Sequence, residues 1–225
     1  MTAGGASDAA AARAGGPPPV RPLTAGLRLV RLHAASRRVP AAAAAIAACA
    51  IGLWIALAAG SWDSYGALQL PLVFEAGCAA AIAITTASPL GEPERVTGRW
   101  LPFLRLATVL VLTAAAAAAL AAAGAGAHLA GGALDVLRNV AGMTGLGLLC
   151  AAVLGGGLAW AGPVGYLVAG AYALYTQWHG PALTTPWLWP ARPPHDLGAA
   201  ICAGLVFAIG LAVITIRGAR DPVGE

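Results

Sequence analysis

The sequence predicts an all-α, polytopic membrane protein with six transmembrane helices and with both termini in the cytoplasm. Three observations predict this class: long apolar runs, an uneven distribution of arginine between the segments that join them, and aromatic residues at the ends of the runs. At a rise of about 1.5 Å per residue, runs of this length measure roughly 27 to 33 Å, the hydrocarbon thickness of a bilayer. The runs cover residues 40–61, 67–87, 102–123, 136–155, 160–177 and 197–216.

The orientation follows from arginine, which is retained in cytoplasmic segments, while acidic residues count for little. With the N-terminus inside, the outer segments carry only Arg138 and Arg192. Aromatic rings prefer the headgroup layer, and Trp100 and Trp160 mark inner ends of the runs. The remaining arginines all fall in inner segments: Arg13, Arg21, Arg28, Arg31, Arg37, Arg38, Arg95, Arg99, Arg105, Arg217 and Arg220.

The segments before and after the runs complete the domain organisation. Residues 1–22 are rich in Ala, Gly and Pro, and we expect a disordered tail. In residues 23–38, Leu23, Leu27 and Val30 recur at helical spacing among arginines, which predicts a basic helix on the inner leaflet. These arginines serve either topology alone or docking. Residues 39–217 form the six-helix domain, and residues 218–225 form a C-terminal tail.

Composition excludes several classes of function. With 59% apolar and 10% charged residues in a chain of 225, nearly all of the chain is used in crossing the membrane. We therefore expect no enzyme activity, no catalytic residue and no cofactor. Without any lysine, a phosphate-binding P-loop is impossible. The formal charge of +4 indicates anchoring at the inner leaflet of the lipid bilayer, and not nucleic-acid binding.

Cysteine and histidine give no sign of a metal site. The four cysteines lie inside separate runs, without histidines at ligand spacing, so we expect neither a disulfide framework nor a zinc site. We interpret them as small packing residues: Cys49, Cys78, Cys150 and Cys202.

Glu75 is the ionisable residue in the middle of a run. A carboxylate there costs several kcal/mol unless it is protonated, hydrated or paired, so it faces a cavity or a partner. Pro71, four residues earlier, removes a helical hydrogen bond and lets the span bend. Glu75 is therefore a candidate for the transport pathway. The alternative is a packing role through a hydrogen bond to a neighbouring helix.

Arg138 and Asn139 mark the outer start of the fourth run and are further pathway candidates. Asp135 lies one turn before Arg138, which predicts either a capping and ion-pairing cluster at a helix end or a gate for an outward opening. In the sixth run, small residues at intervals of four predict a face for close helix packing, formed by Gly204, Ala208 and Ala212.

Two connecting segments differ from plain linkers. The outer segment, residues 178–196, is rich in Trp and Pro, and we expect it to lie in the outer interface or to dip into it. The inner segment, residues 88–99, carries charges of both signs, namely Glu92, Glu94, Arg95 and Arg99. It forms either a solvated turn or a docking surface for a cytoplasmic partner.

Together, these features resemble the membrane subunits of ABC-type exporter permeases. The inner sequence EPERVTG (residues 92–98) is similar to the loop that touches the ATPase subunit in that family, and residues 178–196 stand where the family has outer re-entrant helices. The chain also resembles actinobacterial transporter-associated membrane proteins through SPLGEPE (residues 88–94) and LRNVAGMTGL (residues 137–146). It departs from the permease pattern at residues 155–159, which are too few for a second docking helix.

The resemblance implies a permease-like subunit in the plasma membrane that exports a small or amphipathic molecule by alternating access. Its partners would be a cytoplasmic ABC ATPase subunit, docked at Glu92, Glu94, Arg95 and Arg99, and either a second copy or another permease subunit. Two alternatives stay open. One is a non-catalytic membrane accessory or immunity protein that binds a transporter or toxin. The other is a proton-coupled carrier that uses Glu75.

Overall fold

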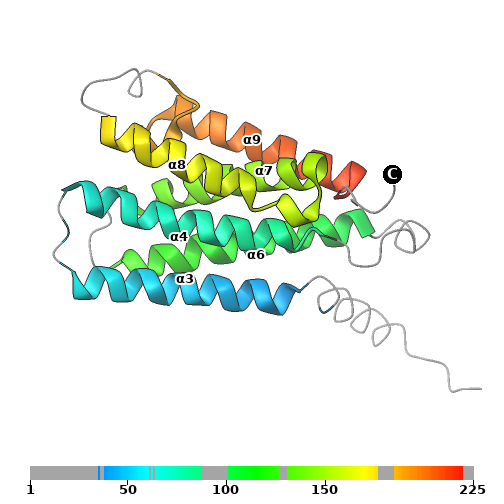
Figure 1. Ribbon diagram of the computed structural model, residues 1–225, viewed down its shortest axis with the longest axis horizontal. Helices are drawn as coiled ribbons and strands as arrows, with labels where there is room; N and C mark the ends of the chain where they lie inside the picture. Colours follow the sequence, from blue (N-terminus) through cyan, green and yellow to red (C-terminus); the bar gives the residue numbers. More distant parts are fainter. Residues whose placement is uncertain are drawn as a thin grey trace, which may run out of the picture. The chain divides into compact units, whose positions relative to one another are not determined.

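The computed structural model describes residues 35, 38–60, 62, 64–87, 101–126, 131–176 and 185–219, all within one compact unit. This part of the chain is helical and holds no strand. Two short 3-10 turns, η1 (Gly156–Leu158) and η3 (Trp189–Ala191), interrupt the connections between helices. The long helices are α3 (Val39–Ala59), α4 (Ser64–Ile84), α6 (Leu101–Gly124), α7 (Gly132–Leu154), α8 (Ala161–Thr176) and α9 (Leu197–Arg217) (Figure 1).

Six candidate spans lie in the described residues, and each is long and apolar enough to cross a membrane; η1 and most of α8 make up one of them. The expected all-α fold with six spanning helices is thus confirmed for this part of the chain, and the protein is a multi-pass membrane protein. Which end of the bundle faces the cytoplasm stays a prediction. The expected tail (residues 1–22), the inner loop and all of the interfacial helix except residues 35 and 38 lie outside the described residues.

Successive long helices run in opposite directions, so α4, α7 and α9 all run the same way (Figure 1). The bundle therefore has two ends. At the first, which we call the Trp189 end, α4, α7 and α9 begin. At the second, which we call the Arg105 end, α3, α6 and α8 begin. The Trp189 end is the one that the arginine distribution predicts to face outward.

Local sequence explains where several helices begin and end. Pro40 stands in the first turn of α3, where its missing N–H costs nothing. Asp196 caps α9, because its carboxylate accepts a hydrogen bond of 2.9 Å from the backbone N–H of Ala199. Gly155 directly follows α7 and Gly218 directly follows α9, with φ angles of 95° and 75°, which favour glycine.

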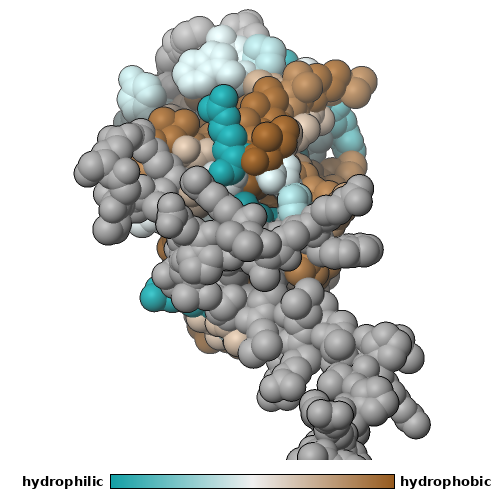
Figure 2. All heavy atoms as spheres, turned by 90° about the vertical axis from the view of Figure 1, so that its right-hand side faces the viewer, coloured by the Kyte–Doolittle hydropathy of each residue, from teal (hydrophilic) through white to brown (hydrophobic). Residues whose placement is uncertain are grey.

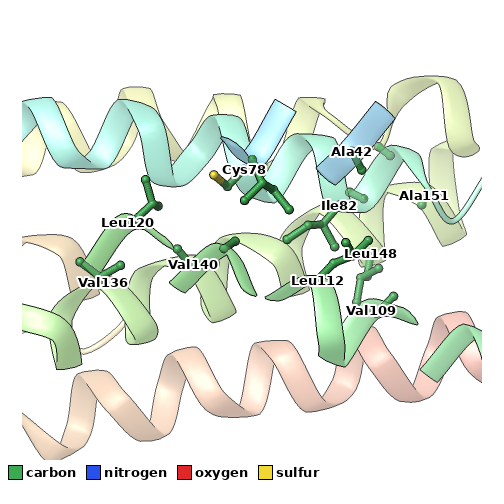
Figure 3. Close-up of a cluster of buried hydrophobic side chains, with 14 of the residues drawn as sticks. Ala42, Cys78, Ile82, Val109, Leu112, Leu120, Val136, Val140, Leu148 and Ala151 are labelled. Carbon is green, nitrogen blue, oxygen red and sulfur yellow. The ribbon is translucent and has the colours of Figure 1, made fainter. Parts of the chain in front are cut away.

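The core of the bundle is built around α7, which packs against α4, α6, α8 and α9. Its Val140 and Leu148 are fully buried and lie in one apolar cluster with Cys78 and Ile82 of α4 and with Leu112 of α6 (Figure 3). Of the 23 residues of α7, eleven are buried: Val136, Arg138, Asn139, Val140, Gly142, Met143, Thr144, Gly145, Gly147, Leu148 and Ala151. The interior of the bundle thus contains polar side chains as well as apolar ones.

α7 and α9 approach each other so closely that only glycine fits at the contact. A Cβ on Gly145 would lie 2.6 Å from backbone atoms of Phe207, and a Cβ on Gly210 would lie 2.5 Å from the carbonyl oxygen of Gly145. Gly145 and Gly210 therefore let the two backbones touch, as small residues do in membrane helix pairs.

The small residues expected to permit close packing in the sixth run are exposed within the described bundle: Gly204, Ala208 and Ala212. In an alanine-rich helix, small residues occur on every face, so their spacing alone does not identify the packed one. The packed face of α9 lies against the glycines of α7, and it carries Ala199, Ala203, Gly210 and Ile214.

Large apolar side chains point away from the bundle. Trp54, Phe103 and Val168 are more than half exposed, as expected of side chains that meet lipid. Figure 2 looks onto the Arg105 end, and hydrophobic residues, in brown, make up much of the described surface in this view.

Candidate functional site

Glu75 lies near the middle of α4 and is 2% exposed. Pro71, one turn earlier, has no N–H to donate to the carbonyl of Ala67, so the hydrogen-bond ladder of α4 is interrupted beside Glu75. Glu75 lies beside the side chain of Asn139 on α7. Its second carboxyl oxygen, Oε2, is buried and has no hydrogen-bond partner among the described residues. The buried carboxyl group of Glu75 thus has an oxygen that no described residue satisfies.

Asp135, Arg138 and Asn139 lie in the first two turns of α7. The helix begins at Gly132, four residues before the expected start of this run, so Arg138 and Asn139 are inside the helix and not at its tip. Asp135 stands in the first turn, where a carboxylate interacts favourably with the helix dipole. Arg138 and Asn139 are buried, although an unpaired guanidinium at this depth would be costly.

The guanidinium of Arg138 is paired on several sides. It forms an ion pair with Asp135. It also donates a hydrogen bond of 2.9 Å to the carbonyl of Pro193 and a longer one of 3.3 Å to the carbonyl of Arg192. Its Nε lies 3.5 Å from Oδ1 of Asn139. These contacts identify Arg138 as the ion-pairing residue of the expected cluster and, in addition, as a link to the segment before α9.

A small cavity of about 30 Å³ lies beside this cluster at the Trp189 end. This volume gives space for about two water-sized molecules. Polar groups line it from both helices: Glu75 on α4, and Asp135 and Asn139 on α7. The rest of its wall is Ala67, Leu68, Pro71, Leu72, Gly131, Gly132, Val136, Leu174 and Pro190.

Residues 185–196, which we call the Trp189 segment, enter the bundle between α8 and α9. Trp189 is 2% exposed and packs in one cluster with Ala199 and Ala203 of α9. Its ring stacks on Tyr166 of α8, with the ring centroids 4.3 Å apart. A Cβ on Gly142 of α7 would lie 2.6 Å from the ring, so the tryptophan needs a glycine there. Three helices therefore enclose this side chain.

Further polar contacts fix the Trp189 segment. The hydroxyl of Tyr166 donates a hydrogen bond of 2.6 Å to the carbonyl of Trp187. Arg192 forms an ion pair with Asp196, and its Nε donates to the same carboxylate at 2.7 Å. The N–H of Ala199 and then the guanidinium of Arg192 hold the pKa of Asp196 below its ordinary value.

The structure therefore brings Glu75, Arg138 and Asn139 into one cluster, although they come from different helices. The expected docking residues lie outside the described residues: Glu92, Glu94, Arg95 and Arg99. Sequence reasoning did not identify Pro193 as a partner of this cluster, nor the burial of Trp189. The i, i+4 spacing of Arg192 and Asp196 is a signal that would have indicated an ordered segment.

Comparison with known protein families, with curated proteins and with solved structures finds no match to this chain.

Proposed function

We propose that the protein is the membrane-spanning, permease-like subunit of an ABC-type exporter in the plasma membrane. It moves a small or amphipathic molecule together with a separate cytoplasmic ATPase subunit. The observation that carries this proposal is the Trp189 segment, which enters the bundle between the fifth and sixth long helices and buries Trp189 among three of them. The permease family that the sequence resembles has re-entrant segments at the corresponding place.

A groove beside the Trp189 segment supports an amphipathic substrate. It measures about 430 Å³, within the range of small-molecule sites. Its wall is mostly apolar and comes from α7, α9 and the residues before α9, and Arg138, His195 and Asp196 are its charged or titratable side chains. A molecule with an apolar body and a polar head matches this distribution. The apolar lining comprises Leu134, Leu137, Ala141, Pro194, Leu197, Ala200 and Gly204.

The contacts between helices suggest how an ATPase subunit would act on this groove. The inner loop joins α4 to α6, and both helices pack against α7. A displacement of that loop would move α4, and α7 would move with it because the two helices are packed together. The Trp189 segment would then move with α7, because Arg138 donates hydrogen bonds to the carbonyls of Pro193 and Arg192. The same ATP-driven movement would thereby change the outward end of the pathway.

Charge reversal in the inner loop tests the proposal. The triple variant Glu92→Lys, Glu94→Lys and Arg95→Glu, purified from the native membrane with an affinity tag, should lose a co-purifying ATPase and its ATP hydrolysis. A matched control, Arg220→Glu with Asp221→Arg, reverses charges in the C-terminal tail and should keep both. Equal ATPase recovery with the triple variant and the control would contradict the docking role, provided that both variants insert normally.

A non-catalytic accessory or immunity protein is the second candidate. It is favoured by the size of the cavity beside Glu75, about 30 Å³, which is too small for a substrate larger than a few atoms. Such a protein would bind a complete transporter through its helix faces. Removing it would change the amount or regulation of that transporter, whereas removing a permease subunit would abolish transport.

A further inference from the structure

The cluster between α4 and α7 carries unequal numbers of positive and negative groups. Glu75 and Asp135 are acidic, and Arg138 is the basic residue beside them. The start of α7 adds roughly half a positive charge through its dipole. With both carboxyl groups ionised, about half a negative charge would stay uncompensated inside the membrane, which is unfavourable.

Three further long helices, α3, α6 and α8, pack against α4. The charged side chain of α6 is Arg105, which lies beside Thr85 and Thr86 at the Arg105 end of the bundle, whereas Asp135 lies at the Trp189 end. α3 and α8 contain no acidic or basic side chain, and their titratable groups are the thiol of Cys49 and the phenols of tyrosines such as Tyr166. Arg192 and Asp196 of the Trp189 segment are paired with each other. Among the described residues, no further basic side chain lies in this cluster, so a bound cation is the group that would balance its charge.

The cavity supplies both the space and the oxygen atoms for such a species. Glu75 lines it, and Oε2 of Glu75 is buried without a hydrogen-bond partner among the described residues. Asp135 and Asn139 line it too. So does Ala67, whose carbonyl has lost its normal helical donor because residue 71 is proline. Backbone carbonyls at interrupted helices and carboxylates are the groups that hold H⁺ and Na⁺ in membrane proteins.

We propose that Glu75, Asp135 and the carbonyl of Ala67 form a binding site for one monovalent cation, a proton or a sodium ion, in the cavity between α4 and α7. A single positive charge pairs with the carboxylate that Arg138 leaves unpaired, and the volume of about 30 Å³ fits an ion of this size. A divalent metal ion is disfavoured, because the described residues contain no group of three His, Cys, Asp or Glu side chains suited to one. The site needs no ATPase subunit.

The purified protein in lipid nanodiscs allows both cations to be tested. Infrared spectra at neutral pH would detect the carbonyl stretch of a protonated carboxylic acid in sodium-free buffer. Unfolding midpoints in sodium chloride and in choline chloride at equal concentration would detect sodium binding. A proton at the site gives the infrared band whatever the salt. A sodium ion gives a higher midpoint in sodium chloride and no band in that salt.

Two variants assign either signal to the site. Glu75→Gln removes one carboxylate without changing its shape, and Asp135→Asn neutralises the other, so each should abolish the band or the sodium-dependent shift. Asp196→Asn removes a carboxylate outside the cavity and should keep the signal. Wild-type protein with neither a band nor a sodium-dependent shift would overturn the proposal. So would a signal that survives in both Glu75→Gln and Asp135→Asn.

Discussion

α7 and α3 are both long enough to cross a membrane, yet they occupy opposite situations in the bundle. α7 buries eleven of its 23 residues and brings an aspartate, an arginine and an asparagine into the interior. α3 buries three of its 21 residues and exposes Trp54 on its surface. In soluble proteins the most apolar helix is the most buried, but here the more polar helix is. Lipid accepts apolar surface without cost, so the interior of a membrane bundle is marked by polar and small residues.

Replacing a tryptophan on each side of the bundle is expected to give the largest difference in stability. Trp189 is enclosed by α7, α8 and α9, so Trp189→Ala should lower the free energy of unfolding by about 3–5 kcal/mol. Trp54 on α3 is 59% exposed, and Trp54→Ala should change the free energy of unfolding by less than about 0.5 kcal/mol. Denaturation in mixed micelles with increasing SDS measures both. Equal losses would show that α3 is packed against something that this bundle does not contain.

Methionine substitutions address the polar interior. Arg138→Met leaves Asp135 without its ion pair and should cost about 3 kcal/mol. Leu53 on α3 is fully buried, and Leu53→Met conserves volume and should cost less than about 1.5 kcal/mol. Adding Asp135→Asn to Arg138→Met should recover part of the loss in the same SDS assay. An Arg138→Met variant as stable as Leu53→Met would mean that the ion pair contributes no net stability.

Replacing one glycine in each helix by alanine should give a smaller difference in stability between α7 and α3. Gly145→Ala places a Cβ against the backbone of Phe207, which cannot move aside, and should cost about 1–3 kcal/mol. Gly52→Ala on α3 meets only the ring of Phe74, which can rotate away, and alanine favours the helix by up to about 1 kcal/mol. The midpoint of thermal unfolding should therefore fall for the first variant and stay or rise for the second. A loss at Gly52 as large as at Gly145 would contradict the difference between the two interfaces.

The smallest effect concerns the cap of α9, a feature that α3 lacks. The pKa of Asp196 is lower in the folded protein than its ordinary value of 3.8. Asp196 therefore contributes stability above the unfolded pKa, and this contribution is lost as the pH falls through the folded pKa. The difference in unfolding midpoint between wild type and Asp196→Asn should be constant near pH 7 and should shrink below about pH 4. A difference independent of pH would exclude this role of the carboxylate.

Much of the fold was predictable from local sequence, because bilayer thickness sets the length of every apolar run. The cost of a buried charge also made Glu75 a candidate without any knowledge of packing, and the place of Arg138 and Asn139 at the outer start of the fourth run made them candidates too. What could not be predicted is which helices meet. Glu75 and Asn139 are 64 positions apart, and their contact depends on α4 and α7 being neighbours. The depth of Trp189 was equally hidden, since an interfacial tryptophan and an inserted one have the same local sequence signal.

The glycine contact between α7 and α9 limits how the bundle can move. Backbone touches backbone at Gly145 and Gly210, so turning either helix about its own axis would drive a side chain into the main chain of the other. This contact disfavours rotation of α7 relative to α9, and Arg138 ties the Trp189 segment to α7 through the carbonyl of Pro193. Helices can slide past each other more easily where flexible side chains form the contact, as Phe74 of α4 does against Gly52 of α3. Relative movement of helices is therefore easier where α3 meets α4 than where α7 meets α9.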